Sequence, residues 1–373
     1  MMQRPWFLPL IGSLAGCGLV PAEQGARQEA PSQRGLWFLA RPEARAQTAP
    51  VPHSGDVAED AAVWIHPDNP ALSLVLGTDD NGALHTYNMD GTPNEMVGDG
   101  TWPAGVDVLY GFPLDGRAVD LAVAAVQING RPGLIVWVID PATRRLSDVT
   151  HGGRIEVFGG GTPSGVCGYK SGRNGRHYVF VTNVRGEVEQ RELWDGGGGT
   201  VAAIPVRTFD VGSAVESCVA DDELADLYVA EAAVGIWRFS AEPNGADKKH
   251  PVALVGEYGL AADVEGLAIY YGPLGQAPGY LIAASQGNNT FLLYERAGGN
   301  RFVGIIDPKA GAIDDVNDVE GIAVTGCATS PQFGGGVFIA KDGDNASGNQ
   351  NFKLYAWEDI AGTQLLSNFC RRG

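Results

Sequence analysis

Residues 264–294 read VEGLAIYYGPLGQAPGYLIAASQGNNTFLLY, which is three short apolar runs separated by turn residues. The first run opens on Val264-Glu265-Gly266, and the second and third are Gly279–Ala284 and Thr290–Tyr294. Short runs rich in Ile, Leu, Tyr and Phe, with Gly and Pro between them, predict antiparallel strands. The stretch therefore describes one supersecondary unit of an all-β protein.

Comparable units open six times along the chain, at a spacing of roughly 50 residues. Repeats of this length built from short strands are typical of propeller blades. The sequence therefore predicts an all-β fold, a six-bladed β-propeller with antiparallel four-stranded blades around a central channel. Five of the six openings carry a carboxylate. The openings are Glu59-Asp60-Ala61, Val106-Asp107-Val108, Pro163-Ser164-Gly165, Val215-Glu216-Ser217, Val264-Glu265-Gly266 and Val319-Glu320-Gly321.

The repeated acids predict a cation site. In a propeller the first strand of every blade lines the channel, so the acids would collect around one mouth. Like charges at that distance raise each other's pKa unless hard cations lie among them. Oxygen ligands in loose sets suit calcium, and we expect several Ca²⁺ ions there. The alternative is that the acids only accept hydrogen bonds from turn backbone groups.

Composition excludes some partners. The chain has 373 residues, a formal net charge of -18 and a sequence pI near 4.6. Nucleic acid and anionic membrane surfaces would repel such a protein, so neither is expected as a partner. The charge fits an exported protein that collects divalent cations, and we expect it to be a monomer.

The N-terminus predicts export. Arg4 precedes an apolar stretch from Trp6 to Leu19 that is too short to span a bilayer. Within it, Leu14-Ala15-Gly16-Cys17 resembles the bacterial lipobox, so residues 1–19 are expected to be a signal peptide with Cys17 as the lipidation site. The alternative is an ordinary cleavable signal with a chance cysteine. We expect an outer-membrane or periplasmic lipoprotein of the bacterial cell envelope, or a secreted protein, with membrane contact only through the N-terminal lipid anchor.

The rest of the chain divides into a tether and the propeller. Residues 20–52 are rich in Ala, Gln, Glu, Arg and Pro with little periodicity, which predicts a flexible tether before a propeller over residues 53–366. Four further cysteines allow three disulfide pairings in an oxidising compartment. Their positions favour Cys167 with Cys218 and Cys327 with Cys370, and free buried thiols are the alternative.

The common catalytic signatures are missing from the sequence. It contains no H-E-x-x-H zinc pair, no Walker loop with its lysine and no G-x-S-x-G nucleophile elbow. The chemistry that remains is acidic side chains plus cations. Divalent ions held close together clamp phosphate oxygens and lower the pKa of a bridging water. The pattern therefore predicts hydrolysis of phosphate esters.

A series of ordered motifs lies between Asp56 and Ile360. They are Glu59–Pro67 (EDAAVWIHP), Gly111–Gly116 (GFPLDG), Ala220–Glu223 (ADDE), Tyr228–Glu231 (YVAE), Asp263–Tyr271 (DVEGLAIYY), Ser285–Asn288 (SQGN), Asp318–Gly321 (DVEG) and Gly348–Lys353 (GNQNFK). Together they resemble the β-propeller phytases, calcium-dependent six-bladed enzymes that hydrolyse inositol hexakisphosphate. The resemblance implies a calcium-dependent phosphomonoester hydrolase of the 3-phytase type, with a small inositol phosphate as its substrate.

The resemblance and the repeat pattern together imply roles for individual residues. Glu216, Asp263 and Glu265 would surround the activated water and act as the catalytic group. Arg185 and Gln286 would contact the substrate. The expected metal ligands are Glu59, Asp60, Glu216, Glu231, Asp263, Glu265, Asp314 and Glu320.

The sequence departs from the family at its basic and phenolic positions. A phosphate-binding Lys is replaced by Asp80-Asn81, an Arg by Gln127-Ile128, a Tyr by Ser164 and a second Lys by Val184, and only Arg185 could restore a charge. A cation that contacts phosphate contributes about 1.5–3 kcal/mol. Two readings stay open: hydrolysis carried by the metal ions, or a catalytically degenerate propeller that binds metal, ligand or a partner protein at the envelope. A lactonase-type propeller has no support in these motifs.

Overall fold

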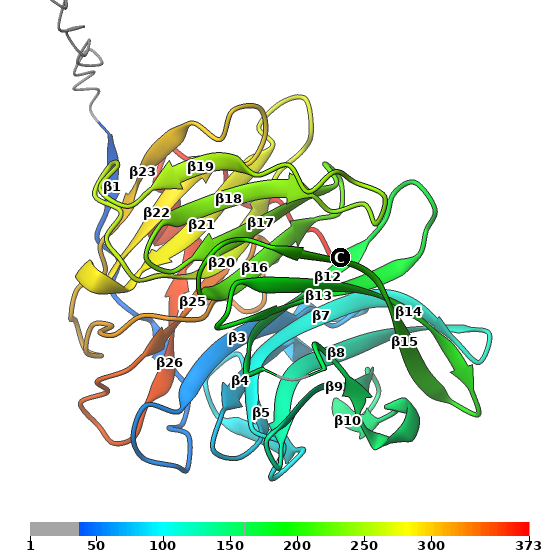
Figure 1. Ribbon diagram of the computed structural model, residues 1–373. Coiled ribbons are helices and arrows are strands. Elements are labelled where there is room, and N and C mark those ends of the chain that lie inside the picture. Colours follow the sequence, from blue (N-terminus) through cyan, green and yellow to red (C-terminus); the bar gives the residue numbers. More distant parts are fainter. Residues whose placement is uncertain (1–36, 160, 373) are drawn as a thin grey trace, which may run out of the picture. The chain divides into compact units, whose positions relative to one another are not determined.

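The structure, a computed structural model, describes residues 37–159 and 161–372. Its strands form six small sheets arranged in a ring (Figure 1), so the predicted six-bladed β-propeller is confirmed. The expected signal peptide, Cys17 and the first part of the expected tether lie outside the described residues. Within the described residues no helix is long and apolar enough to cross a membrane.

One strand of each blade lines the centre of the ring. Each of these inner strands contacts the inner strands of the two neighbouring blades, and the last of them contacts the first, so the ring is closed. The inner strands are β3 (Ala58–Trp64), β7 (Pro103–Leu114), β12 (Pro163–Lys170), β16 (Val215–Asp221), β20 (Val264–Tyr271) and β24 (Ile322–Thr325).

The second and third strands of each blade follow by antiparallel pairing. The second strands are β4 (Leu74–Asp79), β8 (Arg117–Ile128), β13 (His177–Asn183), β17 (Asp226–Glu231), β21 (Gly279–Ser285) and β25 (Val337–Asp342). The third strands are β5 (Leu84–Asn88), β9 (Arg131–Asp140), β14 (Glu187–Gly197), β18 (Gly235–Ser240), β22 (Thr290–Glu295) and β26 (Asn351–Ala356).

The outer strands complete the blades. They are β6 (Pro93–Val97), β10 (Arg145–Asp148), β15 (Thr200–Asp210), β19 (His250–Leu254), β23 (Phe302–Ile306) and β2 (Ala46–Gln47), and β11 (Ile155–Glu156) adds a short pairing to β9. The short helical segments are η1 (Pro70–Leu72), η2 (His151–Gly153), η3 (Gln286–Asn288) and α1 (Trp357–Ala361).

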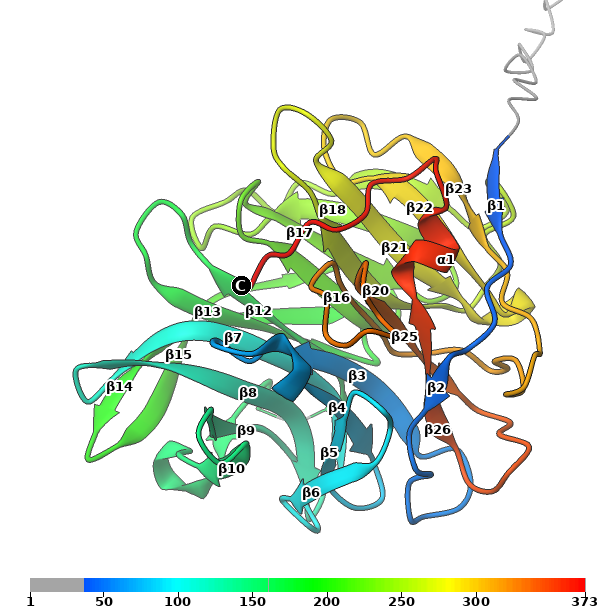
Figure 2. The ribbon, with the colours of Figure 1, turned by 180° about the vertical axis from the view of Figure 1, so that it is seen from behind.

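The sixth blade is built from both ends of the described chain. Strand β2 pairs with β26, and β1 (Phe38–Ala40) adds a parallel strand to β23 of the fifth blade (Figure 2). Residues 37–52 therefore belong to the propeller, and the expected tether boundary at residue 52 is wrong. The reason is that strands of two or three residues are too short to show a periodic pattern, and they gain their stability from pairing with a distant segment.

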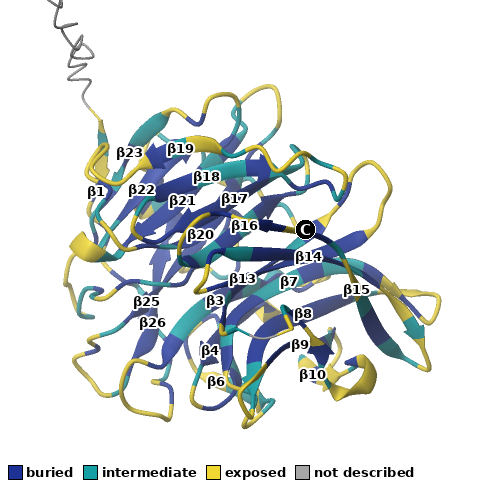
Figure 3. Ribbon diagram, in the orientation of Figure 1, coloured by how far each residue is buried: buried dark blue, intermediate teal, exposed yellow. Residues whose placement is uncertain are grey.

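The apolar core lies between the blades. Six buried clusters fill the six interfaces between neighbouring sheets, including the interface of the last blade with the first. Strands β4 and β25 are buried along their whole length, since both of their faces pack on neighbouring blades (Figure 3). Near-continuous apolar runs such as Val337–Ala340 follow from this two-sided burial.

Two disulfides reinforce the ring, and they are the two pairs that the sequence positions favour. Cys167 on β12 is bonded to Cys218 on β16, which joins the inner strands of the third and fourth blades. Cys327, just after β24, is bonded to Cys370, so the chain beyond α1 is fixed to the sixth blade. The propeller therefore extends past the expected end at residue 366.

Candidate functional site: an acidic mouth of the channel

Five inner strands begin with a β-bulge, and the bulged residue lines one mouth of the channel. The ladder shifts its register there in β3, β7, β12, β16 and β20. A bulge turns a side chain out of the regular alternation, which is why bulges are common beside active sites. The residues in or beside this mouth are Glu59, Asp60, Ala104, Ser164, Glu216, Ser217, Glu265, Gly266, Glu320 and Gly321. We call the group Glu59, Glu216, Glu265 and Glu320 the acidic mouth.

Glycines after two of these acids let the blades approach closely. A Cβ at Gly266 would collide with the carbonyl oxygen of Glu320. A Cβ at Gly321 would collide with the Cα of Asp60. The Glu-Gly pairs of the sequence therefore bring the carboxylates of neighbouring blades together.

One predicted opening is wrong. Strand β7 begins at Pro103, so Ala104 takes the bulge position, and Asp107 lies deeper in the channel. The carboxylate of Asp107 accepts hydrogen bonds from the backbone N–H of Val108 at 2.7 Å and of Gly168 at 2.8 Å. The mouth thus receives acids from four blades rather than five.

Asp60 is held in the same way as Asp107. Its carboxylate accepts the backbone N–H of Ala61 at 2.8 Å and of Val106 at 3.0 Å. Each of the two aspartates therefore connects its own inner strand to the next one around the ring. Both therefore accept hydrogen bonds from backbone groups, which is the structural alternative to metal binding given in the sequence analysis. Asp60 also faces the mouth.

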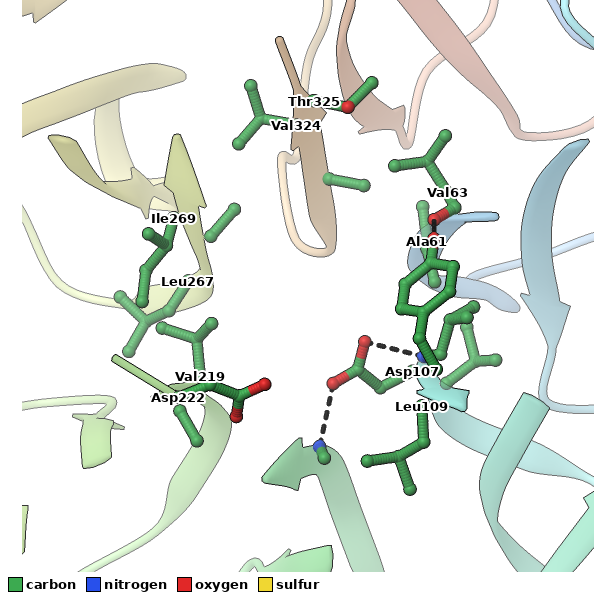
Figure 4. A pocket seen from close by; sticks show the side chains of 18 of the residues that line it. Ala61, Val63, Asp107, Leu109, Val219, Asp222, Leu267, Ile269, Val324 and Thr325 are labelled. Carbon is green, nitrogen blue, oxygen red and sulfur yellow. Dashed lines mark hydrogen bonds between the residues drawn. The ribbon is translucent and has the colours of Figure 1, made fainter. Parts of the chain in front are cut away.

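A cavity of about 370 Å³ continues from Asp60 into the channel. Figure 4 shows Asp107 and Asp222 on facing walls, with both carboxylates directed into this cavity. Arg371 and Arg372 of the C-terminal tail line its other end, where Arg372 Nε donates to the carbonyl of Ile65 at 2.8 Å. Ile65 follows the last residue of β3, so the tail and the acidic mouth lie at opposite ends of the inner strands.

The electrostatics of the acidic mouth are those of crowded carboxylates. Burial raises the pKa of Glu59 to about 10, and the charges of Glu320 and Asp80 add to the shift. Burial likewise raises the pKa of Glu265 to about 9, with Glu216, Glu320 and Asp263 as further causes. Ionising these buried, crowded groups is costly without a counter-ion, and a cation bound among them would stabilise their charged form.

Apart from Asp60, which accepts backbone hydrogen bonds, the expected metal ligands fall into two groups. The first group has side-chain oxygens that accept no hydrogen bond and form no ion pair within residues 37–159 and 161–372. It consists of Glu59, Glu216, Asp263 and Glu265. Burial, followed by the charge of Asp263, raises the pKa of Glu216, so Asp263 lies within electrostatic range of the mouth. These four carboxylates have lone pairs available for a cation.

The second group is neutralised by protein side chains. Glu231 accepts hydrogen bonds from Lys249 Nζ at 2.8 Å, Trp237 Nε1 at 2.7 Å and Ser213 Oγ at 2.7 Å. Burial works against ionisation of Glu231, but these hydrogen bonds outweigh it and lower its pKa.

Asp314 and Glu320 also belong to the second group. Asp314 pairs with Lys353 at 2.6 Å, and Glu320 pairs with Lys341 at 2.9 Å. Glu231 and Asp314 do not line the mouth, so of the expected ligands the structure gathers only Glu59, Asp60, Glu216, Glu265 and Glu320 in one cavity.

The two expected substrate-binding residues lie at the same end of the ring. Gln286 follows β21, and its Nε2 donates to Glu320 Oε1 at 3.3 Å, so it orients an acid of the mouth. Arg185 lies in the turn after β13, whose last residue Asn183 pairs with Pro163 at the start of β12. Its side chain is exposed and has no ion-pair partner in the described part of the chain.

Sequence reasoning missed four charged residues beside the mouth. They are Asp56, Asp80, Asp318 and Lys341. Asp80 had been considered only as the replacement of a lysine, yet burial and neighbouring acids raise its pKa to about 6. Asp80 could have been placed beside the mouth from its position directly after the second strand of a blade, because that turn lies at the mouth in every repeat.

Comparisons with known proteins find relatives along most of the chain. The family model described as Phytase matches residues 17–368. A 3-phytase of Bacillus subtilis (strain 168) is 39% identical over 323 residues, which covers 85% of this chain and 84% of that protein.

Two solved structures share the fold at low sequence identity. An α-L-arabinofuranosidase, Arb93A from Fusarium graminearum, aligns with a TM-score of 0.55 at 9% identity and covers 87% of this chain and 99% of its own. The PQQ-bound aldose sugar dehydrogenase of Streptomyces coelicolor aligns with a TM-score of 0.51 at 12% identity, over 84% of this chain and 97% of its own.

Proposed function

Because the chain belongs to the phytase family and is a phytase-type hydrolase, we propose that it is a calcium-dependent 3-phytase that releases phosphate from myo-inositol hexakisphosphate. One observation carries the calcium part of this proposal. Three carboxylates with free lone pairs, Glu59, Glu216 and Glu265, line one end of the channel, and a fourth, Asp263, lies within electrostatic range of Glu216 and Glu265. A phosphate ester could not approach them without cations between the two sets of anions.

The donor set fits calcium better than a softer metal. All four groups offer carboxylate oxygens, and neither cysteine nor histidine lines the mouth. Ca²⁺ accepts six to eight oxygen ligands in loose geometry, so water and substrate oxygens would complete its shell. When bound, calcium supplies the positive charge that attracts phosphate and lowers the pKa of a coordinated water.

The protein contributes a rigid frame for this chemistry. Glu216 and Glu265 project from bulges on the inner strands of neighbouring blades, and the glycine beside Glu265 fixes the distance to the next blade. Glu216, Asp263 and Glu265 would hold the ion that supplies this chemistry. Arg185 is the exposed cation at this end that would contact a phosphate of the substrate.

The positions of the missing basic residues favour a slower enzyme. Asp80 and Val184 follow strand ends at the mouth, and Gln127 and Ser164 lie within the last or first two residues of their strands there; none of the four supplies a positive charge. Each lost phosphate contact would weaken transition-state binding by about 1.5–3 kcal/mol. A propeller that binds metal or ligand without turnover is the second candidate function that this observation favours.

Phosphate release under controlled calcium tests the proposal. The purified protein would be assayed with phytate and with an aryl phosphate, each with excess calcium and with a chelator. We expect release from phytate only when calcium is present, together with a higher melting temperature in calcium because the ions bind the folded ring. A calcium-dependent rise in melting temperature without phosphate release from either ester would favour the non-catalytic function. No effect of calcium on either quantity would remove calcium from the proposal.

The export of the protein also remains a proposal. The apolar segment of residues 6–19 and the lipobox at Cys17 support a lipoprotein of the bacterial envelope. The two disulfides support an oxidising compartment. Metabolic labelling with a fatty acid would label the wild type and leave Cys17→Ser unlabelled; equal labelling of both proteins would contradict acylation at Cys17.

A further inference from the structure

A buried lysine lies at the edge of the acidic mouth. Lys341 is near the end of β25, and its side chain has no solvent exposure. Its Nζ lies 2.9 Å from Glu320 Oε2, 3.0 Å from Asp56 Oδ1 and 3.5 Å from Asp318 Oδ2. An ammonium group has three donors, and here three separate carboxylates surround it.

The three carboxylates form a set that matches a cation. Asp56, Asp318 and Glu320 each offer one oxygen, and these oxygens lie within 4.8 Å of one another. They come from the segments before β3 and before β24, which meet where the last blade closes against the first. The ammonium of Lys341 stands among them, so the positive charge that such a cluster requires is already part of the protein.

The position of Lys341 has counterparts in other blades. Thr78 Oγ1 accepts the backbone N–H of Asp60 at 2.8 Å, and Thr182 Oγ1 lies 3.1 Å from Ser164 Oγ. In each case a residue of the second strand contacts the bulged residue of the inner strand. In the sixth blade an ammonium group takes the place of the hydroxyl group, and it contacts Glu320.

We propose that Lys341 is a built-in cation of the acidic mouth, which occupies the position of a divalent ion between Asp56, Asp318 and Glu320 and positions Glu320 beside the metal-binding acids. The inference rests on the calcium dependence proposed above. Lys341 does not touch the substrate, because its side chain is buried. It limits the number of divalent ions that the mouth binds, since the ammonium and an ion cannot share the same carboxylates.

Counting bound ions tests this role. Lys341→Met removes the charge and keeps an unbranched side chain of similar length. Calcium bound per folded chain would be measured by equilibrium dialysis, and the calcium-induced rise in melting temperature would be measured alongside. We expect Lys341→Met to bind about one ion more than the wild type and to show the larger calcium-induced rise, because the freed carboxylates then accept an ion. An unchanged ion count would overturn the proposal.

A second buried lysine is the matched control. Lys353 is also without solvent exposure and pairs with Asp314 and Asp342, which do not line the mouth. Lys353→Met should leave the ion count unchanged. An equal gain in Lys353→Met would contradict a specific role of Lys341.

A surface variant covers the case in which Lys341→Met does not fold. Asp318 is exposed, so Asp318→Asn should fold, and it removes one carboxylate of the set. The proposal predicts an unchanged calcium count for Asp318→Asn, and the loss of one ion would show that the set holds metal in the wild type. If the wild type itself binds no calcium, the proposed function fails together with this inference. If the wild type binds calcium and releases phosphate while Lys341→Met binds no additional ion, only the inference fails.

Discussion

The two ends of the channel treat negative charge in opposite ways. At the end near the C-terminal tail, Arg372 pairs with Asp120, Arg371 pairs with Glu223 at 3.1 Å, and the buried Arg296 pairs with Asp221. At the acidic mouth, only Glu320 has a cationic partner among the described residues. Arginine side chains neutralise the acids at the tail end, which stabilises the fold. Most acids of the mouth have no such partner among the described residues and are available to bind ions.

The largest expected effect is the loss of stability when a buried ion pair is removed at the end of the channel near the C-terminal tail. Arg296→Met leaves Asp221 buried without its partner, and breaking a buried pair costs about 3–5 kcal/mol of unfolding free energy. Chemical denaturation with and without calcium would measure the loss, which should be the same in both conditions. Arg301→Met removes an exposed pair with Glu295 and should leave the unfolding free energy almost unchanged. A loss in Arg296→Met that calcium restores would contradict the separation of the two ends.

At the acidic mouth, one neutral substitution should have opposite effects on activity and on stability. Glu265→Gln removes a proposed metal ligand, so kcat/KM for phytate should fall about 10²–10³-fold. In chelator the same variant should melt at a higher temperature than the wild type, because it removes one of several crowded carboxylates. Glu156→Gln, at an exposed position on β11, should change neither quantity. A lower melting temperature for Glu265→Gln in chelator would show that the mouth is not strained by repulsion.

Removing the disulfide between Cys327 and Cys370 tests how much this bond stabilises the end of the channel near the C-terminal tail. The double substitution Cys327→Ser and Cys370→Ser frees the tail that carries Arg371 and Arg372. We expect a loss of about 2–4 kcal/mol in unfolding free energy, typical of a loop of this size. Phosphate release at saturating calcium should remain, since the tail lies far from the mouth along the inner strands. A parallel loss of activity in a variant that is still folded at the assay temperature would couple the two ends.

The smallest effect concerns a carboxylate in the channel between the ends. Burial raises the pKa of Asp222 to about 6, with Asp107 among the further causes. An acid whose folded pKa is raised is protonated more readily in the folded state, so its contribution to stability falls as the pH rises from about 4 to 6. Asp222→Asn should therefore be more stable than the wild type at pH 8 and nearly equal to it near pH 4.

Thermal unfolding in chelator at several pH values would measure the difference. Asp68→Asn, at an exposed position, is the control for the loss of one carboxylate. A stability difference that is constant from pH 4 to 8 would show that Asp222 does not titrate in this range.

The fold and most of the mouth follow from the sequence because they depend on repetition. Glu216, Glu265 and Glu320 share one place in repeated units, and closing the ring brings equal places to one end. Asp107 was predicted at the start of its inner strand but lies further along it. A single carboxylate among apolar residues does not show where a strand begins. The start of β7 at Pro103 is set by pairing with β8.

Other features depend on contacts between segments far apart in the chain. The aromatic residues at the start of the propeller are one case, since Trp37 packs edge-on against Tyr258 and Phe302 of the fifth blade. The ion pair of Lys341 with Asp56 is another, because it joins residues from the first and last blades. Such contacts leave no local periodic pattern in the sequence, so they could be identified only from the structure.

The shared sixth blade has a consequence for biosynthesis. Gln47 emerges from the ribosome 306 residues before its partner Lys353. The ring therefore cannot close until Lys353 has been made, and the nascent chain has an unpaired strand edge until then. For the proposed export, such late closure would keep the polypeptide unfolded enough to pass through a translocation pore, and folding would follow on the far side.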